Sequence, residues 1–504
     1  MLAEVPSSTV LGVDGHRVSV EVHVSSGLPS FSIVGLPDAS CREARDRVRA
    51  ALLSSGFTWP MQRITVNLAP SGLPKVGSGL DLPIAVGVLV ASGQLPVEVL
   101  GGRSFVGELG LDGSIRAVAG AVPLIEALGT GEIVLPAASA VEASVGAAGT
   151  LRPVSRLTAV VEALQGEAPW PSDGPVEPPE LVAVGGPDLA DVRGQPTARL
   201  ALEVAAAGAH HLLMIGPPGS GKTMLARRLP GLLPPLAPEH RLEVSKIHSA
   251  SGSGQAVGTA AAPPFRAPHH GASMVSLIGG GSAAVRPGEA SLAHRGVLFL
   301  DEMGEFPTRV LDALRQPLEE GVIRVARARA SVQFPARFLL VGATNPCPCG
   351  GGNGPASCRC SDAARARYLR RLSGPLLDRF DLRVVVPRPP AEAVLGGVGG
   401  ESSESVAARV ERARCRARER GVVANSDLSA AALDAVSPLD AGARRLILDA
   451  LAAGRLSPRG ARRVRAVALT LADLVGAEPP LGDELLATAL GLRIELAPTL
   501  EVAA

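Results

Sequence analysis

The sequence is poor in lysine. Lysine occurs only at Lys75, Lys222 and Lys246, although lysine and arginine together number 49 of the 504 residues. This skew is most simply a nucleotide bias of the genome, and it makes the three remaining lysines worth reading. The net charge is only +1. The sequence therefore excludes nucleic-acid binding through overall charge and leaves only local basic patches for that role.

Long apolar runs and a disulfide framework are lacking too. No apolar run reaches the length of a membrane span, and the N-terminus lacks the charged and apolar pattern of a cleavable signal. We therefore expect a cytoplasmic protein with no membrane partner. Six cysteines in a long chain, four of them within residues 347–360, do not resemble a disulfide framework.

The length predicts two or three domains. The first part combines strictly alternating strands, such as residues 18–24, with an amphipathic helix at 44–53, which indicates an α+β domain. A proline-rich stretch follows that neither a helix nor a central strand would tolerate. The expected organisation is a domain at 1–165, a linker at 166–187, an α/β core at 188–388 and a helical part at 389–504.

A phosphate-binding loop lies at the centre of the chain. The apolar run 212–215 ends in a glycine-rich segment and is followed by helical character, which is the strand, loop and helix order of a P-loop. Glycines permit a backbone whose N–H groups point at phosphate oxygens, the lysine adds a positive charge, and the threonine hydroxyl can hold Mg²⁺. The predicted nucleotide-binding residues are Gly216, Pro217, Pro218, Gly219, Ser220, Gly221, Lys222 and Thr223.

Two further apolar runs end in polar side chains that suit nucleotide hydrolysis. Residues 297–300 precede Asp301 and Glu302, so both carboxylates are expected at the carboxyl end of a buried parallel strand. We predict that Asp301 holds Mg²⁺ with Thr223 and that Glu302 polarises the attacking water. Asn345 ends the third run and is predicted to orient that water against the γ-phosphate.

One arginine is a candidate for completing the site of a neighbouring subunit. Arg379 stands directly before the apolar strand 382–386. It fits an arginine finger, which in GTPases is worth roughly 10³–10⁵ in rate. The simpler alternative is an ion pair with Asp378 or Asp381 at the surface.

Residues 321–334 alternate in the manner of a β-hairpin that carries Arg324, Arg327 and Arg329. These arginines can contact DNA phosphates without reading the base sequence. A solvated hairpin face is an equally good interpretation. The basic helix expected at 405–420 leaves the same two interpretations open.

The clustered cysteines form two Cys-x-Cys pairs around a glycine-rich loop. Four thiolates satisfy tetrahedral zinc, but Cys-x-Cys replaces the usual Cys-x-x-Cys spacing. Two interpretations stay open, a Zn²⁺ site and reduced thiols that bind no metal. The residues concerned are Cys347, Cys349, Cys358 and Cys360.

Taken in order, these motifs resemble an AAA+ ATPase, and more closely the ComM/YifB family of magnesium-chelatase-like AAA+ proteins. The resemblance implies an α/β fold with an N-terminal Lon protease-like α+β domain, a P-loop AAA+ parallel-sheet domain and a C-terminal helical lid. It also implies ATP and Mg²⁺ as cofactors, a homo-hexameric ring, and a motor that acts on DNA in branch migration during recombination of incoming DNA. The matching phrases are Phe265-Arg-Ala-Pro-His-His270, Gly279-Gly-Gly-Ser282, residues 286–302, Leu314-Arg-Gln-Pro-Leu-Glu-Glu320 and Asn345-Pro-Cys-Pro-Cys-Gly350.

The same resemblance assigns further residues. Arg459 stands where the family has its second sensor and is expected to reach the γ-phosphate. The segment 265–281 corresponds to a pore insertion, in which His269 and His270 either contact DNA or are packed.

The front domain resembles the proteolytic domain of Lon around residues 73–81. A Ser–Lys dyad needs a lysine close enough to deprotonate the serine, and Lon-type domains place this lysine well downstream of the nucleophile. The nucleophile position falls on Gly79, however, and no lysine occurs between Lys75 and Lys222. We therefore predict a non-proteolytic domain, in which Lys75 and Ser78 either bind an anion or form a structural loop.

Two other functions remain as alternatives to a DNA motor. One is a chelatase-type motor that remodels a protein partner. The other is an ATP-dependent protease, which the missing lysine disfavours.

Overall fold

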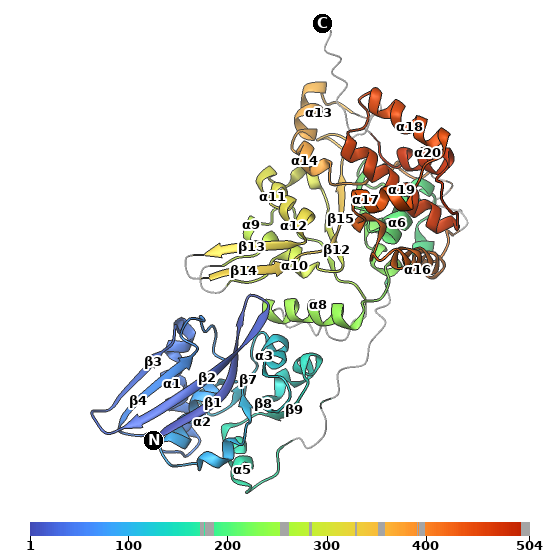
Figure 1. Ribbon diagram of the computed structural model, residues 1–504. Helices are drawn as coiled ribbons and strands as arrows, with labels where there is room; N and C mark the ends of the chain where they lie inside the picture. Colours follow the sequence, from blue (N-terminus) through green and yellow to red (C-terminus); the bar gives the residue numbers. More distant parts are fainter. Residues whose placement is uncertain are drawn as a thin grey trace.

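The computed structural model describes residues 1–171, 176, 186–252, 262–281, 285–327, 330–350, 358–390, 392 and 399–494. An N-terminal domain lies below a P-loop module, and a group of C-terminal helices lies on one side of that module (Figure 1). Within the described residues, no helix is long and apolar enough to cross a membrane.

The N-terminal domain is built on a four-stranded sheet in the order β1-β2-β4-β3. The strands β1 (Leu2–Leu11), β2 (Asp14–Ser25) and β4 (Arg63–Ala69) are antiparallel neighbours, and β3 (Ser30–Val34) runs parallel to β4. Valines at every second position of β2 are buried, which confirms the strand predicted from their alternation. The helix predicted at 44–53 is also present, as α1 (Ala39–Ser54). A second helix, α2 (Asp81–Ala91), is buried along its whole length.

The second half of this domain is a smaller parallel sheet. It contains β5 (Ser104–Phe105), β8 (Glu132–Pro136) and β9 (Thr150–Val154), with α3 (Ala121–Leu128) and α5 (Leu157–Gln165) beside it. Most of the proline-rich segment predicted to follow, 166–187, lies outside the described residues.

The P-loop module contains a five-stranded sheet in the order β11-β12-β15-β10-β16, and all neighbouring strands are parallel. Its strands are β11 (Phe265–Arg266), β12 (Val297–Leu300), β15 (Leu339–Thr344), β10 (Leu212–Ile215) and β16 (Leu382–Val385). Because the strands are parallel, the polar residues that follow β10, β12 and β15 meet at one edge of the sheet.

Two residues of the segment expected as a pore insertion, 265–281, are part of the sheet. Phe265 and Arg266 form β11 at its edge. Phe265 stacks on Phe299 of β12, and Arg266 forms a bidentate ion pair with Glu289. The apolar and ionic contacts of these two residues bind them to the core.

The C-terminal helices pack directly on the P-loop module. A single buried apolar cluster runs from β10 and α6 (Pro196–Gly208) into these helices. Two arginines of the basic helix α16 (Ser403–Glu419) bind the P-loop module, since Arg409 pairs with Glu203 and Arg414 donates to the carbonyl of Ala206. The helices are α16 (Ser403–Glu419), α17 (Ala430–Val436), α18 (Ala441–Ala452), α19 (Pro458–Val475) and α20 (Asp483–Gly491).

The N-terminal domain docks on the P-loop module through α8 (Pro238–Ser251), which lies between them (Figure 1). Lys246 on α8 forms ion pairs with Asp14 at 3.2 Å and Glu126 at 2.8 Å, both in the N-terminal domain. Ser249 accepts hydrogen bonds from the backbone of α3 and the residue before it. In addition, Val13 in the β1–β2 turn shares a buried cluster with Val332 of strand β14 (Ala330–Pro335).

Candidate nucleotide-binding site

The P-loop connects β10 to the short helix α7 (Lys222–Ala226). Two of its glycines need their conformational freedom, because Gly219 and Gly221 have φ of +74° and +90°. Gly216 is required for a different reason: a Cβ atom there would lie 2.1 Å from the carbonyl oxygen of Val386. These glycines therefore allow a tight loop at the carboxyl end of β10.

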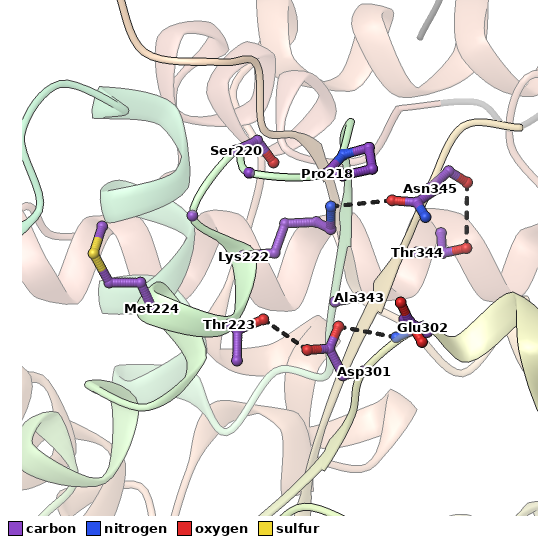
Figure 2. Close-up of a pocket in the computed structure, with 12 residues that line it drawn as sticks. Pro218, Ser220, Lys222, Thr223, Met224, Asp301, Glu302, Ala343, Thr344 and Asn345 are labelled. Atoms are coloured by element: carbon purple, nitrogen blue, oxygen red, sulfur yellow. Dashed lines mark hydrogen bonds between the residues drawn. The ribbon is translucent and has the colours of Figure 1, made fainter. Parts of the chain in front are cut away.

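Lys222 sits inside this loop. Its Nζ donates to the carbonyls of Gly216 at 2.7 Å and Pro217 at 3.0 Å, and lies 3.4 Å from Oδ1 of Asn345 (Figure 2). Burial lowers the pKa of Lys222, while Asp301 and Glu302 act in the opposite direction. The ammonium is thus held between the loop and the end of β15, where the phosphates of a nucleotide would enter.

Thr223 and Asp301 form the candidate magnesium site. The Thr223 hydroxyl donates to Oδ2 of Asp301 at 2.6 Å (Figure 2). A hydroxyl and a carboxylate are the hard oxygen ligands that Mg²⁺ prefers, and the ion usually keeps several waters as well. The two side chains fit Mg²⁺ because they already converge from different elements on one point.

The two remaining polar residues flank the same cavity, whose volume is about 420 Å³. The side chain of Glu302 is 55% exposed, and its backbone has φ of +50°, a left-handed conformation that is rare outside glycine. Asn345 lies on the same side of Lys222 as Glu302, beside the lysine ammonium (Figure 2). The cavity is lined by residues 218–224, Asp301, Glu302 and 343–345.

Gln195 is a contact of the P-loop that sequence reasoning missed. Its Nε2 donates to the Ser220 carbonyl at 3.2 Å and also to the carbonyl of Pro387 after β16. Gln195 is buried and has φ of +58° just before α6. No pattern in the sequence signals this role, because the contact joins segments 25 and 192 residues apart.

His269 and His270 lie at the nucleotide site. Nδ1 of His270 is 3.2 Å from Oε2 of Glu302, and the two imidazole rings pack with centroids 4.1 Å apart. His270 also contacts the edge of Phe306. The two rings pack against each other, and His270 adds a contact with the predicted water-activating carboxylate. A contact of these histidines with DNA stays a prediction.

Arg379 and Arg459 are brought together by one glutamate. Arg379 is 4% exposed and forms an ion pair with Glu319 of α12 (Arg315–Glu320), and Nη2 of Arg459 lies 3.5 Å from the same carboxylate. Neither arginine is among the residues that line the nucleotide cavity.

The simpler interpretation of Arg379, a pair with a neighbouring aspartate, differs from the structure. Asp378 lies 3.7 Å from Arg383, and Asp381 is paired with Arg463. Oδ2 of Asp381 also lies 3.6 Å from Nδ1 of the buried His210 and accepts the backbone N–H of His211 at 3.1 Å. Arg379 is thus buried against Glu319, an acidic residue far from it in the sequence.

The hairpin predicted at 321–334 is present as β13 (Val322–Arg327) and β14 (Ala330–Pro335). Arg324 is half-exposed and paired with Glu320. Arg329 lies outside the described residues, as does the side chain of Arg327.

The four cysteines also come together. The sulfur atoms of Cys347, Cys349, Cys358 and Cys360 all lie within 4.8 Å of one another.

The Lon-like loop has the contacts of a structural element. Lys75 is fully buried, and its ammonium donates to the carbonyl of Pro70. Ser78 donates to Glu108, and the carbonyl of Gly79 accepts from the N–H of Gly107 at 2.8 Å. Gly79 has no nucleophilic side chain, and Lys75 is bound to backbone, so the loop contains no Ser–Lys pair.

Three family models match separate parts of the chain. The model of magnesium chelatase, subunit ChlI, matches residues 188–394. A model of subunit ChlI of Mg-chelatase matches residues 20–139, and one of the C-terminal part of subunit ChlI matches residues 400–493. The strand order and the P-loop site agree with these matches, and together they define a magnesium-chelatase-like AAA+ ATPase.

Curated relatives match almost the whole chain. An uncharacterized protein of Mycobacterium tuberculosis is 46% identical over 496 residues, which covers 97% of both chains. Competence protein ComM of Haemophilus influenzae is 44% identical over 498 residues, or 98% of this chain and 97% of that one. The uncharacterized protein YifB of Escherichia coli is 44% identical over 482 residues, or 94% and 93%. The chain belongs to the ComM/YifB family of magnesium-chelatase-like AAA+ proteins.

Proposed function

We propose that the protein is an ATP-driven ring motor, a homo-hexamer that acts on DNA in branch migration during recombination. The main support for a ring is the position of Arg379 and Arg459. Both approach Glu319 and neither lines the nucleotide cavity of its own chain. An AAA+ site needs a positive charge on the γ-phosphate in the transition state, and a second copy of the chain can supply it.

Five residues of the cavity then have a role in hydrolysis. Lys222 binds the β- and γ-phosphates, and Thr223 and Asp301 would hold Mg²⁺, which neutralises the phosphate charge. Glu302 accepts a proton from water as the water oxygen attacks the γ-phosphorus and the bond to the ADP oxygen breaks. Asn345, which already faces Lys222, orients that water.

Support for DNA as the substrate comes from the hairpin and from a relative. The strands β13 and β14 extend away from the sheet (Figure 1), and the sequence of the hairpin segment 321–334 carries Arg324, Arg327 and Arg329. In a ring these guanidinium groups would bind phosphates without base specificity. The relative from Haemophilus influenzae is named a competence protein, which agrees with a role in handling incoming DNA.

ATPase and DNA-binding assays test this proposal. We expect DNA to stimulate ATP hydrolysis and a branched duplex to be unwound. The logarithm of DNA affinity should fall with the logarithm of salt concentration. Replacing Arg324, Arg327 and Arg329 by alanine should make this fall less steep, by about 0.7–0.9 for each phosphate that is no longer neutralised. The charge-matched control replaces the exposed arginines of α1, which are Arg42, Arg45 and Arg49.

The control variant should keep the slope of the unmodified chain. An ATPase rate that is indifferent to DNA, together with salt slopes that do not differ between the two triple variants, would exclude the hairpin as a DNA contact.

The chelatase-type motor is the second candidate, because all three family models are drawn from a magnesium chelatase subunit. It predicts stimulation of hydrolysis by a protein partner and none by DNA. The protease alternative has little support, since Gly79 occupies the nucleophile position and Lys75 is buried against backbone. Degradation of an unfolded substrate protein by the purified chain would be needed to support protease activity.

A further inference from the structure

We propose that Cys347, Cys349, Cys358 and Cys360 bind one structural Zn²⁺ ion. Three of the sulfur–sulfur distances are 3.4, 3.5 and 3.7 Å. Four sulfurs at about 2.3 Å from a tetrahedral Zn²⁺ lie about 3.8 Å from one another. The observed spacing therefore needs only small adjustments to accept the ion.

The spacing differs from that of disulfide-bonded cysteines. A disulfide brings two sulfurs to about 2.0 Å, well below these three distances. Four sulfurs from two Cys-x-Cys pairs also converge on one point, whereas disulfides would join them two by two. Tetrahedral coordination by four thiolates selects zinc or iron among the common metals, and zinc needs no redox partner.

One cationic group lies beside the sulfurs. The guanidinium of Arg365 is a neighbour of Cys358. On binding, each thiol gives its proton to solvent, so four thiolates and one Zn²⁺ leave a net charge of −2. Arg365 offsets part of that charge in the manner of an outer-shell partner.

The position of the cluster gives the ion a role in the motor. We call residues 347–350 and 358–360 the cysteine knuckle. Asn345 lies two residues before it and faces Lys222. Gly350 packs on the P-loop so closely that a Cβ atom would lie 2.7 Å from Cγ of Pro218. The beginning of the knuckle is therefore built against the phosphate-binding loop.

The end of the knuckle leads to the arginine side of the module. Ser361 caps α13 (Asp362–Leu369), whose Tyr368 hydroxyl lies 3.4 Å from Oγ1 of Thr344 at the end of β15. The short helix α14 (Gly374–Leu377) then leads to Arg379. One ion would thus fix the chain between the γ-phosphate sensor and the finger, and this consequence rests on the proposed function, whereas zinc binding does not.

Metal analysis of the full-length chain, purified without chelator, tests the site directly. We expect about one zinc per chain, and less than about a tenth of that when Cys358 and Cys360 are both replaced by serine. The control is Cys415→Ser, since Cys415 lies exposed on α16 outside the cluster. This control should keep the zinc of the unmodified chain.

Cobalt binding tests the site in the unmodified chain, and its result therefore does not depend on whether the double variant folds. Co²⁺ added to the zinc-depleted unmodified chain should give the intense visible bands of a tetrahedral tetrathiolate. Little zinc in the unmodified chain, iron in its place, or full zinc in the double variant would each overturn the proposal, as would octahedral cobalt bands.

The consequence for the motor is measured separately. Glu302→Gln should keep full zinc while losing hydrolysis, so the two readouts are independent. The zinc-free chain should still bind a fluorescent ATP analogue but hydrolyse ATP slowly. If zinc is present and its removal leaves hydrolysis unchanged, the ion has no role in positioning Asn345 and Arg379.

Discussion

Replacing Arg379 by alanine in every subunit should remove most ATP hydrolysis and leave ATP binding nearly intact. An arginine finger is worth roughly 10³–10⁵ in rate, or about 4–7 kcal/mol of the barrier. In the isolated chain Arg379 is held by Glu319, whose side chain is 48% exposed. Separating the buried Arg379 from this half-exposed carboxylate costs about 1 kcal/mol, so the net loss should be at least about 10²-fold in kcat.

Mixing two inactive variants distinguishes a finger that acts on a neighbour from one that acts within its own chain. Lys222→Ala removes nucleotide binding but keeps its own Arg379, while Arg379→Ala keeps the P-loop. In a mixed ring, an intact P-loop can therefore meet an intact arginine from the next subunit. Random mixing in equal amounts places such interfaces at about a quarter of all positions in a head-to-tail ring.

The assay is steady-state phosphate release after the two variants are co-expressed with different affinity tags and purified as mixed rings. Each variant alone should show only background. If mixed rings also stay at background, although they contain both tags, Arg379 does not act across the interface. Near-normal hydrolysis by Arg379→Ala alone would refute its catalytic role altogether.

Three more predictions concern the site and its surroundings. Glu302→Gln should bind ATP normally and hydrolyse it about 10²–10⁴-fold more slowly in single-turnover assays, since the general base is lost. His270→Ala should raise the basal rate of ATP hydrolysis by about two- to fivefold, because the exposed contact with His270, of about 0.5–1 kcal/mol, no longer holds Glu302. An unchanged rate would mean that this contact does not restrain Glu302. Burial lowers the pKa of His211 and His294 to about 4, so the unfolded chain binds more protons than the folded chain between about pH 4 and 6.5. Stability should therefore fall as the pH drops through this window, by at most about 3 kcal/mol per histidine, and thermal unfolding midpoints across the window would check it.

The sequence predicted the parts of the site that follow strands. Each of β10, β12 and β15 is a short apolar run that ends in a polar motif, and parallel strands place such ends at one edge of the sheet. This local rule was sufficient to predict that Lys222, Asp301 and Asn345 lie close together. It carries no information on partners that come from other elements.

The contacts that were missed are tertiary. Glu319 joins Arg379 and Arg459, which is 140 residues from it, and neither pairing has a local signature. The strand β1 was missed because Pro6 and the buried polar residues Ser7, Ser8 and Thr9 hide its alternation. Ser7 and Ser8 donate to carbonyls 98 and 116 residues away, which only the folded domain provides.

The surroundings of the three lysines explain why arginine does not replace lysine at these positions. Lys222 occupies the narrow loop that it donates to, and Lys246 lies between two carboxylates at the domain interface. Lys75 is fully buried and donates to the carbonyl of Pro70. A compact ammonium fits such places, whereas a guanidinium has five donors in a fixed planar fork.

Lys75 gives the sharpest test of this argument. Burial lowers its pKa, so its charge is already disfavoured at this position. Lys75→Met keeps the length of the side chain and removes the donor, whereas Lys75→Arg buries several donors without acceptors, each at a cost of about 1–3 kcal/mol. The arginine variant should therefore unfold at a clearly lower temperature than the methionine variant. Equal midpoints for the two variants would mean that nucleotide bias alone, and not the space around Lys75, explains where lysine survives.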